Sequence, residues 1–196
     1  SVLWEVNDRS SNATIADNIG YVLGKPVIVP VKTSGGTVAW KAIFGNGYNS
    51  NNGKAVLFVV DVGTGAVQTI QANEAGAPSG TNGLGSIVVV DNWSGTSLAS
   101  RGRDGYADTV YAADQKGAVW KFDLRPATPA NQTVPVFVTN TDSTGVRQPI
   151  LGGLAAAAAP NGGVMVFFGT GSFSRGTLPR STWTKLYAEF GFLHEQ

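Results

Sequence analysis

Three aspartates near one glycine are the residues of this sequence best suited to binding chemistry. The segment 104–108 (DGYAD) places two carboxylates around a tight turn, and Asp91 ends an apolar run upstream of it. Ca²⁺ takes about six to eight oxygen ligands, which loops supply by alternating carboxylates with backbone carbonyls around a glycine. We therefore predict a calcium site made of the Asp91, Asp104 and Asp108 carboxylates and the Tyr106 carbonyl.

The long stretch between residues 91 and 104 leaves the other ligands of this site open. Asn92, Ser94 or the Asp114 carboxylate are alternative oxygen donors, as are water molecules. Compared with a compact calcium loop, a loop of this length costs little extra closure entropy but is less pre-organised. We therefore expect the residues between 91 and 104 to weaken calcium binding without abolishing it. The alternative is an ordinary Asp-Gly turn in which Asp108 only caps the next strand.

The sequence lacks the residue sets that enzymes use for nucleophilic or thiol chemistry. It has no cysteine, and its single histidine, His194, lies near the end of the chain. A Ser-His-Asp triad would have to use that histidine, and no G-x-S-x-G motif is present. The segment 169–171 (GTG) lacks the lysine of a phosphate-binding loop. We predict that the protein is not an enzyme and has no catalytic or organic-cofactor residues.

Two further aspartates, Asp61 and Asp123, each end a predicted strand just before a turn. Carboxylates at such positions commonly accept hydrogen bonds from backbone N–H groups two residues on. We interpret both as structural, because they lie in different repeats and need not approach each other as a catalytic pair would.

The composition favours many short strands. Glycine accounts for 26 of the 196 residues, and only 14% of the residues are charged. Glycine turns between apolar segments are typical of β-rich folds. The net charge of +1, without a run of Lys or Arg, argues against nucleic-acid binding. The apolar runs are too short to cross a bilayer, so we predict no membrane span in this chain.

Strand-like segments recur in three units of about 60 residues each. The predicted strands are 25–32, 39–44, 54–62 and 66–71, then 86–91, 108–113, 118–124 and 134–138, then 148–158, 164–169 and 184–190. Four strands per unit is the size of a propeller blade. We predict an all-β, partial β-propeller of about three four-stranded antiparallel blades, at residues 25–72, 84–140 and 146–190. A β-sandwich is the alternative, but it has no reason to repeat.

Aromatic residues give the repeat its register. We assign Phe44, Tyr111 and Phe168 to equivalent positions, each followed by a small residue. Trp4, Trp40 and Trp120 lie in predicted strands and are expected to pack between blades. For Trp93, in the long stretch after Asp91, exposure and contact with a partner stay open as the alternative to a structural role. Propellers commonly have about four to eight blades, so we expect an excerpt of a longer chain, with residues 2–6 as the last strand of another blade.

Several segments resemble the C-terminal propeller of the PilY/PilC-type proteins of type IV pili. The resemblance extends from about Leu3 to Gly171 and is most specific in three segments: 45–50 (GNGYNS), 104–114 (DGYADTVYAAD) and 118–124 (AVWKFDL). Two departures are the long stretch between residues 91 and 104 and the sequence after Ser174, which follows the family only loosely.

The resemblance implies a non-enzymatic protein at the pilus tip or outer-membrane surface of a bacterium. Such proteins support pilus extension, twitching motility and adhesion, and in several of them calcium in the propeller influences the pilus. The expected partners are pilus assembly proteins or minor pilins, and host or surface ligands. Two alternatives stay open: a fragment of a quinone-dependent dehydrogenase propeller, and a purely structural propeller without a ligand.

Overall fold

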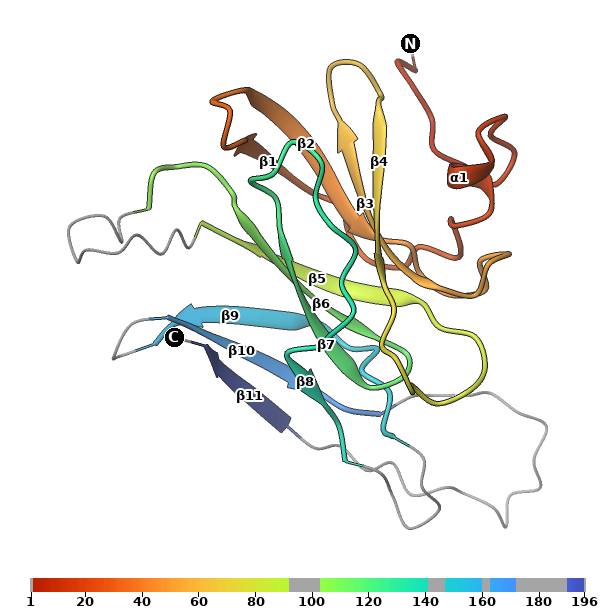
Figure 1. Cartoon of the computed structure of the whole chain (residues 1–196), viewed down its shortest axis with the longest axis vertical. Helices are drawn as coiled ribbons and strands as arrows, with labels where there is room; N and C mark the ends of the chain where they lie inside the picture. The colour runs from red at the N-terminus through yellow and green to blue at the C-terminus, as the bar shows by residue number, and fades with distance from the viewer. Residues whose placement is uncertain (1, 92–102, 141–146, 160–162, 172–189, 196) are drawn as a thin grey trace.

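The structure is a computed structural model that describes residues 2–91, 103–140, 147–159, 163–171 and 190–195. These residues form one short helix, α1 (Ala13–Ala16), and three antiparallel sheets. Figure 1 shows the sheets stacked from top to bottom in chain order. The strands are β1 (Val27–Lys32), β2 (Val38–Gly45), β3 (Ala55–Asp61) and β4 (Val67–Ala72), then β5 (Leu84–Val90), β6 (Thr109–Asp114), β7 (Ala118–Asp123) and β8 (Phe137–Val138), then β9 (Leu154–Ala158), β10 (Val164–Gly169) and β11 (Phe190–Glu195).

Within each sheet the strands neighbour one another in chain order. The first sheet has the order β1-β2-β3-β4 and the second β5-β6-β7-β8, and all their pairings are antiparallel. The prediction of an all-β fold with four-stranded antiparallel blades is confirmed in these two sheets. The third sheet contains β9, β10 and β11 among the described residues.

The central strands β3 and β6 are apolar on both faces because both of their faces are covered. β3 (AVLFVVD) is buried at every residue except its last. Its hairpin to β4 turns at Gly65, whose φ of 72° favours glycine. A Cβ at Gly65 would also meet the Trp4 ring at 2.7 Å, so the turn and the covering tryptophan both require glycine there.

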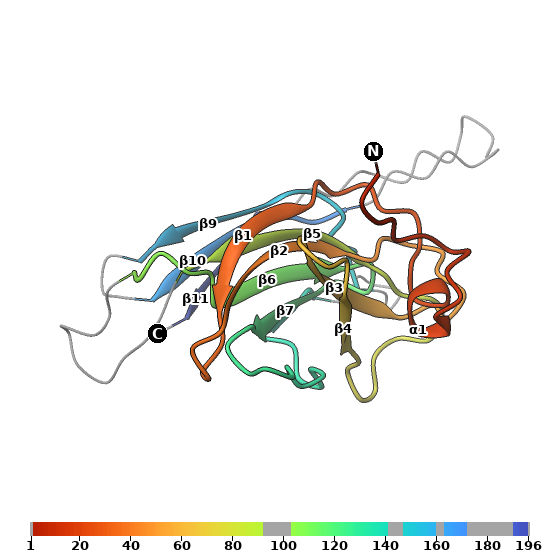
Figure 2. The same ribbon diagram turned by 90° about the horizontal axis from the view of Figure 1, so that it is seen from above.

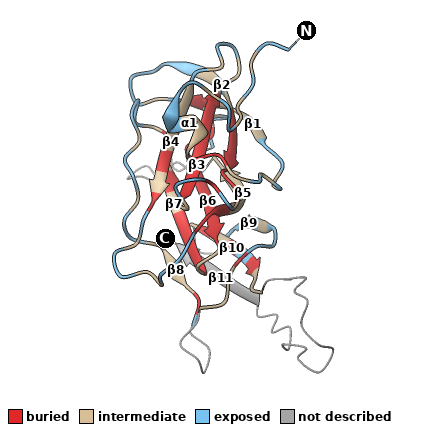
Figure 3. Cartoon of the chain, turned by 90° about the vertical axis from the view of Figure 1, so that its right-hand side faces the viewer, coloured by how far each residue is buried: buried red, intermediate tan, exposed pale blue. Residues whose placement is uncertain are grey.

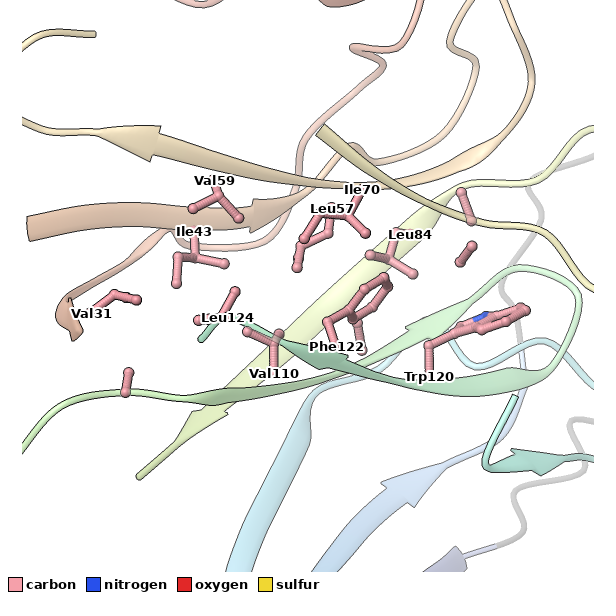
Figure 4. Packing of buried hydrophobic residues seen from close by; sticks show 14 of the residues in the cluster. Val31, Ile43, Leu57, Val59, Ile70, Leu84, Val110, Trp120, Phe122 and Leu124 are labelled. Atoms are coloured by element: carbon pink, nitrogen blue, oxygen red, sulfur yellow. The ribbon is translucent and has the colours of Figure 1, made fainter. Parts of the chain in front are cut away.

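The largest hydrophobic core lies between the first and second sheets. Its side chains point toward one another from the two sheets (Figure 4), and they include Ile43, Leu57, Val59 and Ile70 from the first sheet and Val110, Trp120 and Phe122 from the second. A smaller cluster of Tyr111, Val164 and Val166 joins the second and third sheets. Figure 3 shows that the buried residues concentrate in the strands between these layers.

The other face of the first sheet is covered in part by the N-terminal segment. Trp4, Val6 and Ile15 pack on a cluster that contains Phe58 and Val60 of β3. Figures 1 and 2 show α1 at the β4 side of the sheet, away from β1. The N-terminal segment therefore covers the half of this face that is farther from β1.

Residues 2–6 do not form the predicted strand. A strand needs a neighbour to pair with, and none of the described strands lies beside this segment. Instead, Trp4 Nε1 donates a hydrogen bond of 2.9 Å to the Val62 carbonyl. The prediction that Trp120 packs between blades agrees with its place in the core between the first and second sheets. Trp4 instead packs on the other face of the first sheet, with residues of that sheet and of the N-terminal segment. The prediction for Trp40 is wrong in this structure, because Trp40 is 58% exposed on the uncovered part of the first sheet.

The repeat register predicted from aromatic residues is also wrong by one position. Asp61 and Asp123 both end a third strand, and the pairs equivalent across the second and third strands are Lys41–Asp61 and Thr109–Asp123. This makes Phe44 equivalent to Ala112, so that Phe44 and Tyr111 lie on opposite faces of their sheets. Successive strand residues alternate faces, so a slip of one residue exchanges the two faces.

Two predicted strands in the third unit differ from the structure. The strand expected at 148–158 begins only at Leu154, because Pro149 has no N–H for a ladder and Gly152-Gly153 weakens extended pairing. The strand expected at 184–190 lies outside the described residues except for its last residue, Phe190, where β11 begins.

Candidate functional site

The candidate calcium residues lie where β5 ends and β6 begins. Asp91 directly follows β5, and Asp108 directly precedes β6. The Asp108 N–H donates to the Val90 carbonyl at 3.2 Å, so the two strands are still hydrogen-bonded at this point. The antiparallel pairing therefore brings Asp91 and Asp108 to the same rim of the second sheet.

The structure brings Asp91 and Asp104 together in one exposed turn. The two carboxylate oxygens of Asp91 accept hydrogen bonds from the backbone N–H groups of Asp104 (3.3 Å) and Gly105 (2.8 Å). Asp104 Oδ1 in turn accepts from the Tyr106 N–H at 3.0 Å. Gly105 has a φ of 87°, which closes the turn. The described part of the loop thus holds two carboxylates and the Tyr106 backbone close together through hydrogen bonds to backbone N–H groups.

Asp108 occupies a different environment from the half-buried Asp91 and the exposed Asp104. It is only 6% exposed, and its Oδ1 accepts a hydrogen bond of 2.8 Å from Thr109 Oγ1. The pKa of nearby Arg125 is raised, chiefly by its hydrogen bonds to Asp123 and to a smaller extent by the charge of Asp108. Among the described residues, no group of three or more His, Cys, Asp or Glu side chains is arranged to hold a metal ion.

The donor chemistry of this loop fits calcium in kind, and its geometry fits in part. All four candidate ligands are oxygens, and Asp91 and Asp104 are already side by side. Asp108 would have to turn its carboxylate from Thr109 to join them. The alternative donors Asn92 and Ser94, and the tryptophan at position 93, lie outside the described residues.

The other alternative donor, Asp114, lies in the interior. Its side chain is 1% exposed and its two oxygens accept four hydrogen bonds of 2.8–2.9 Å. The donors are the Asn82 amide, the Trp120 indole N–H and the backbone N–H groups of Lys116 and Ala118. These four hydrogen bonds use the lone pairs of the Asp114 carboxylate within the fold, so few remain for a metal ion.

The candidate loop also contacts the first sheet. The Ala107 N–H donates to the Pro30 carbonyl of β1 at 2.8 Å, and Ala107 forms a parallel bridge with Val31. The Lys32 ammonium lies 5.4 Å from the centroid of the Tyr106 ring, a cation–π distance. A change in the conformation of this loop would therefore also alter its contacts with β1, where the first and second sheets meet.

Asp61 and Asp123 have the structural role predicted for them. Asp61 Oδ1 accepts from the Thr64 N–H at 2.9 Å, and its Oδ2 lies 3.0 Å from Lys41 Nζ. Lys41, followed by Thr64, lowers the pKa of Asp61 to about 2. Burial raises the pKa of Asp123, but hydrogen bonds from the Arg125 side chain and backbone outweigh burial, and the net pKa is lowered.

The sequence analysis missed one buried polar residue, Asn46, which lies where the first and second sheets meet. Asn46 follows β2 at the place where Asp114 ends β6, and it is fully buried. Its Oδ1 accepts from the backbone N–H groups of Val56 and Leu84, and its Nδ2 donates to the carbonyls of Asn18 and Lys54. Its position after the second strand of its unit was the available signal.

Antiparallel four-stranded sheets, each formed by consecutive strands and packed face to face, define this chain as part of a β-propeller. The family model of the PilY1 beta-propeller domain matches residues 1–187. The chain therefore belongs to the PilY1 β-propeller family, and the resemblance found in its sequence is confirmed.

Characterised relatives agree with this assignment. The chain is 38% identical over 191 residues to a type IV pilus biogenesis factor PilY1 homolog of Xylella fastidiosa, covering 88% of this chain and 12% of the relative. It is 29% identical over an alignment of 217 residues to type IV pilus biogenesis factor PilY1 of Pseudomonas aeruginosa strain PAO1, covering 100% of this chain and 17% of the relative.

A solved structure shows the same fold. The crystal structure of the Pseudomonas aeruginosa PilY1 C-terminal domain superposes with a TM-score of 0.62 at 30% identity, over 87% of this chain and 35% of that one. The chain thus spans about a third of the solved domain and less than a fifth of the full-length relatives. Within the part of the chain that the structure describes, no helix has the length and apolarity to cross a membrane.

Proposed function

We propose that this chain is a propeller module of a protein that supports type IV pilus extension, twitching motility and adhesion. The observation that carries the proposal is the match of residues 1–187 to the PilY1 propeller family, together with relatives named as type IV pilus biogenesis factors. The proposed location is the pilus tip or the outer-membrane surface of a bacterium. The proposed partners are pilus assembly proteins or minor pilins, and ligands on a host or other surface.

The proposed role is binding and assembly rather than catalysis. The carboxylates most prominent in the sequence are held by neighbouring donors: Asp61 by Lys41, and Asp114 by four N–H groups. Lys41 lowers the pKa of Asp61 to about 2, so Asp61 stays ionised and is a poor general acid or base at neutral pH. A quinone-dependent dehydrogenase would instead show the absorbance of a bound quinone in the purified full-length protein.

The function is tested by complementation. A strain that lacks the full-length gene is supplied with the parent gene or with a gene lacking residues 25–140. The parent gene is expected to restore surface pili and twitching zones, and the deleted form to restore neither, although it is made and exported. Normal pili and motility with the deleted form would contradict the proposal.

We further propose that calcium modulates this role through the loop that contains Asp91 and Asp104. The support is the turn in which Asp91 accepts the N–H groups of Asp104 and Gly105, which holds two carboxylates and the Tyr106 backbone together. In this proposal Asp108 completes the set. We expect an affinity of about 0.1–1 mM, and weak competition from Mg²⁺, which demands a near-ideal octahedral shell.

Calorimetric titration of the full-length protein with Ca²⁺ tests this site. Asp104→Ala is the variant of choice, because among the described residues the Asp104 side chain accepts a hydrogen bond from the exposed Tyr106 N–H alone, whereas Asp108 is buried. We expect the affinity to fall by about tenfold or more, as when one charged ligand is removed. The exposed Asp8→Ala is the matched control and should bind as the parent does. Equal affinity in Asp104→Ala and the parent would refute the site.

A further inference from the structure

Two loop segments lie side by side at one end of the first sheet: residues 17–23, which precede β1, and residues 46–52, which join β2 to β3. The Tyr21 N–H donates to the Tyr48 carbonyl at 2.7 Å, and the two residues form an antiparallel bridge. Residues opposed in such a bridge project their side chains to one face. The two ring centroids lie 5.6 Å apart, and Tyr21 is 63% exposed. This end of the sheet therefore carries a pair of tyrosine rings, of which Tyr21 is open to solvent.

Close backbone packing holds the two tyrosines in place. A Cβ at Gly20 would collide with the Tyr48 carbonyl, and a Cβ at Gly47 would collide with the Tyr21 carbonyl, so both positions require glycine. The Gly20 N–H also donates at 2.9 Å to the carbonyl of Asn46, which is fully buried. The Tyr21 ring thus stands on a fixed backbone, and little conformational entropy is lost when it contacts a ligand.

Exposed amide side chains follow Tyr48 in the same loop, at Asn49, Asn51 and Asn52. Asn51 donates to the Asp17 carboxylate at 3.5 Å, and Asn52 donates to the Asn18 side-chain carbonyl at 3.2 Å. These contacts with the first segment position both amides. An amide side chain has two N–H donors and one carbonyl acceptor. Within the described residues, Asn51 and Asn52 therefore each keep a donor and an acceptor for a ligand.

The same loop contains a strained residue and an unpaired hydroxyl. Asn49 has a φ of 59°, in the left-handed region that favours glycine. Ser50 is 7% exposed, and its Oγ has no hydrogen-bond partner within the described residues. Both features cost folding free energy, and features of this kind concentrate at binding sites, where a ligand or an ordered water completes the hydrogen bonds.

We infer that Tyr21 and the amides of Asn49, Asn51 and Asn52 form a binding site for a neutral carbohydrate. A sugar ring has an apolar face of C–H groups, which stacks on an aromatic ring, and hydroxyl groups at its edge, which pair with amide donors and acceptors. Asp17 is the only charged residue in the two segments, so they offer no positive charge to an acidic ligand. The inference rests on the proposed adhesive role and names the chemical class of the surface ligand.

Calorimetric titration of the full-length protein tests the site, with mannotriose, lactose and chitotriose as neutral probes and a heparin fragment as the acidic probe. We expect at least one neutral probe to bind at millimolar concentration. Tyr21→Ala should lower its affinity by about tenfold or more, as loss of a stacked aromatic ring does for other flat ligands. Tyr21→Phe keeps the ring and should keep most of the affinity. Val134→Ala, at a 76% exposed position in the second sheet's loop, is the control and should bind as the parent does.

Three results of this titration would overturn the inference. They are the absence of binding by all three neutral probes, binding of the heparin fragment alone, and an unchanged affinity in Tyr21→Ala. A Tyr21→Phe variant that binds as weakly as Tyr21→Ala would overturn it too, because the stacking ring is then not what holds the sugar.

Complementation separates this inference from the proposed function. The full-length gene with Tyr21→Ala should restore surface pili and twitching as the parent gene does, but the cells should adhere about tenfold less to beads coated with the bound sugar. Absence of pili in this strain would indicate that a pilus protein contacts Tyr21, and it would overturn the inference while the proposed function stands. Failure of the parent gene to restore pili would contradict the proposed function, whereas sugar binding is measured independently on the purified protein.

Discussion

Asp114 and Asp91 belong to the same sheet and both accept hydrogen bonds from N–H groups, but their surroundings differ. Asp114 is 1% exposed and has four donors, one from the loop before β5 and three from the β6–β7 hairpin. Asp91 is half-buried directly after β5 and accepts from two backbone N–H groups of one turn. An ionised carboxylate has about four lone-pair positions, so Asp114 is saturated and Asp91 is not. The Asp114 carboxylate therefore has a structural role, whereas the Asp91 carboxylate has lone pairs left for a further ligand.

A second comparison concerns the same position in two sheets. Asn46 directly follows the second strand of the first sheet, at the position equivalent to Asp114, which ends the second strand of the second sheet. Asn46 faces two donors and two carbonyl acceptors, whereas Asp114 faces donors alone. An amide suits the first environment and a carboxylate the second. The residue type at each position therefore matches the hydrogen-bonding groups around it. We expect both Asn46→Asp and Asp114→Asn to lower the free energy of unfolding.

The largest effect is expected from Asp114→Ala. Removal of the carboxylate leaves the N–H groups of Asn82, Trp120, Lys116 and Ala118 without their acceptor in the interior. Loss of one partner in a buried charged network costs about 3–5 kcal/mol. Urea denaturation should show this decrease in the free energy of unfolding, while Asp8→Ala at the surface should leave it unchanged. A loss below about 1 kcal/mol would mean that Asp114 is not a structural centre.

A somewhat smaller loss is expected from Asn46→Asp. The new carboxylate would face the carbonyls of Asn18 and Lys54, which now lie 2.7 and 2.8 Å from the Asn46 amide nitrogen. Burial and these carbonyls would raise the pKa of the new carboxyl in the folded state, so its protonated form is tolerated and its ionised form is not. We expect about 2–3 kcal/mol of destabilisation near pH 7 and less near pH 4. Denaturation at both pH values tests this, and a pH-independent loss would contradict it.

The ion pair of Asp61 and Lys41 gives a smaller, pH-dependent effect. The pKa of Asp61 is lowered from 3.8 to about 2 in the folded protein, chiefly by Lys41. A lowered pKa means that the contribution is fully present above the unfolded value and is lost as the pH falls through the folded one. Asp61→Asn should therefore cost about 1 kcal/mol at neutral pH, as partly exposed pairs do. The difference from the parent should shrink from about pH 4 to about pH 2, and Asp8→Asn should show no such trend.

The strands were predictable from the sequence because their signals are local. The segments β2, β3, β6 and β7 are apolar or alternating and are bounded by glycine turns such as Gly65 and Gly117. The face of each residue was less predictable, since it depends on register, and the one-residue error between Phe44 and Tyr111 exchanged the two faces. The exposure of Trp40 depends on which layers cover the first sheet, which its own strand does not encode.

The candidate site, like the fold, could be predicted from the sequence only in part. The closeness of Asp91 and Asp104 followed from the sequence, because one ends a strand and the other opens the turn that returns to it. The environment of Asp108 did not follow, since its hydrogen bond to Thr109 depends on how the β5–β6 ladder ends. The Asp114 network was missed as a structural centre because its donors come from residues 82, 116, 118 and 120, which only the folded sheet brings together.

The smallest effect on stability, and the one that best separates the two carboxylates, is expected from Asp91→Ala. It removes two hydrogen bonds from exposed backbone N–H groups that water can replace, so without calcium the loss should be about 0.5–1 kcal/mol, well below that of Asp114→Ala. With calcium in the millimolar range, the proposed site should stabilise the parent by ligand linkage, about 1.4 kcal/mol when the ligand is tenfold above its dissociation constant. Asp91→Ala should lose that increment, whereas Asp61→Asn, whose carboxylate is distant in sequence and paired with Lys41, should keep it.

Thermal denaturation of the full-length protein with and without Ca²⁺ measures both quantities. If Asp91→Ala costs as much as Asp114→Ala in the absence of calcium, Asp91 is occupied by the fold and the distinction between the two carboxylates fails. If it retains the full calcium increment, the distinction stands but calcium binds elsewhere.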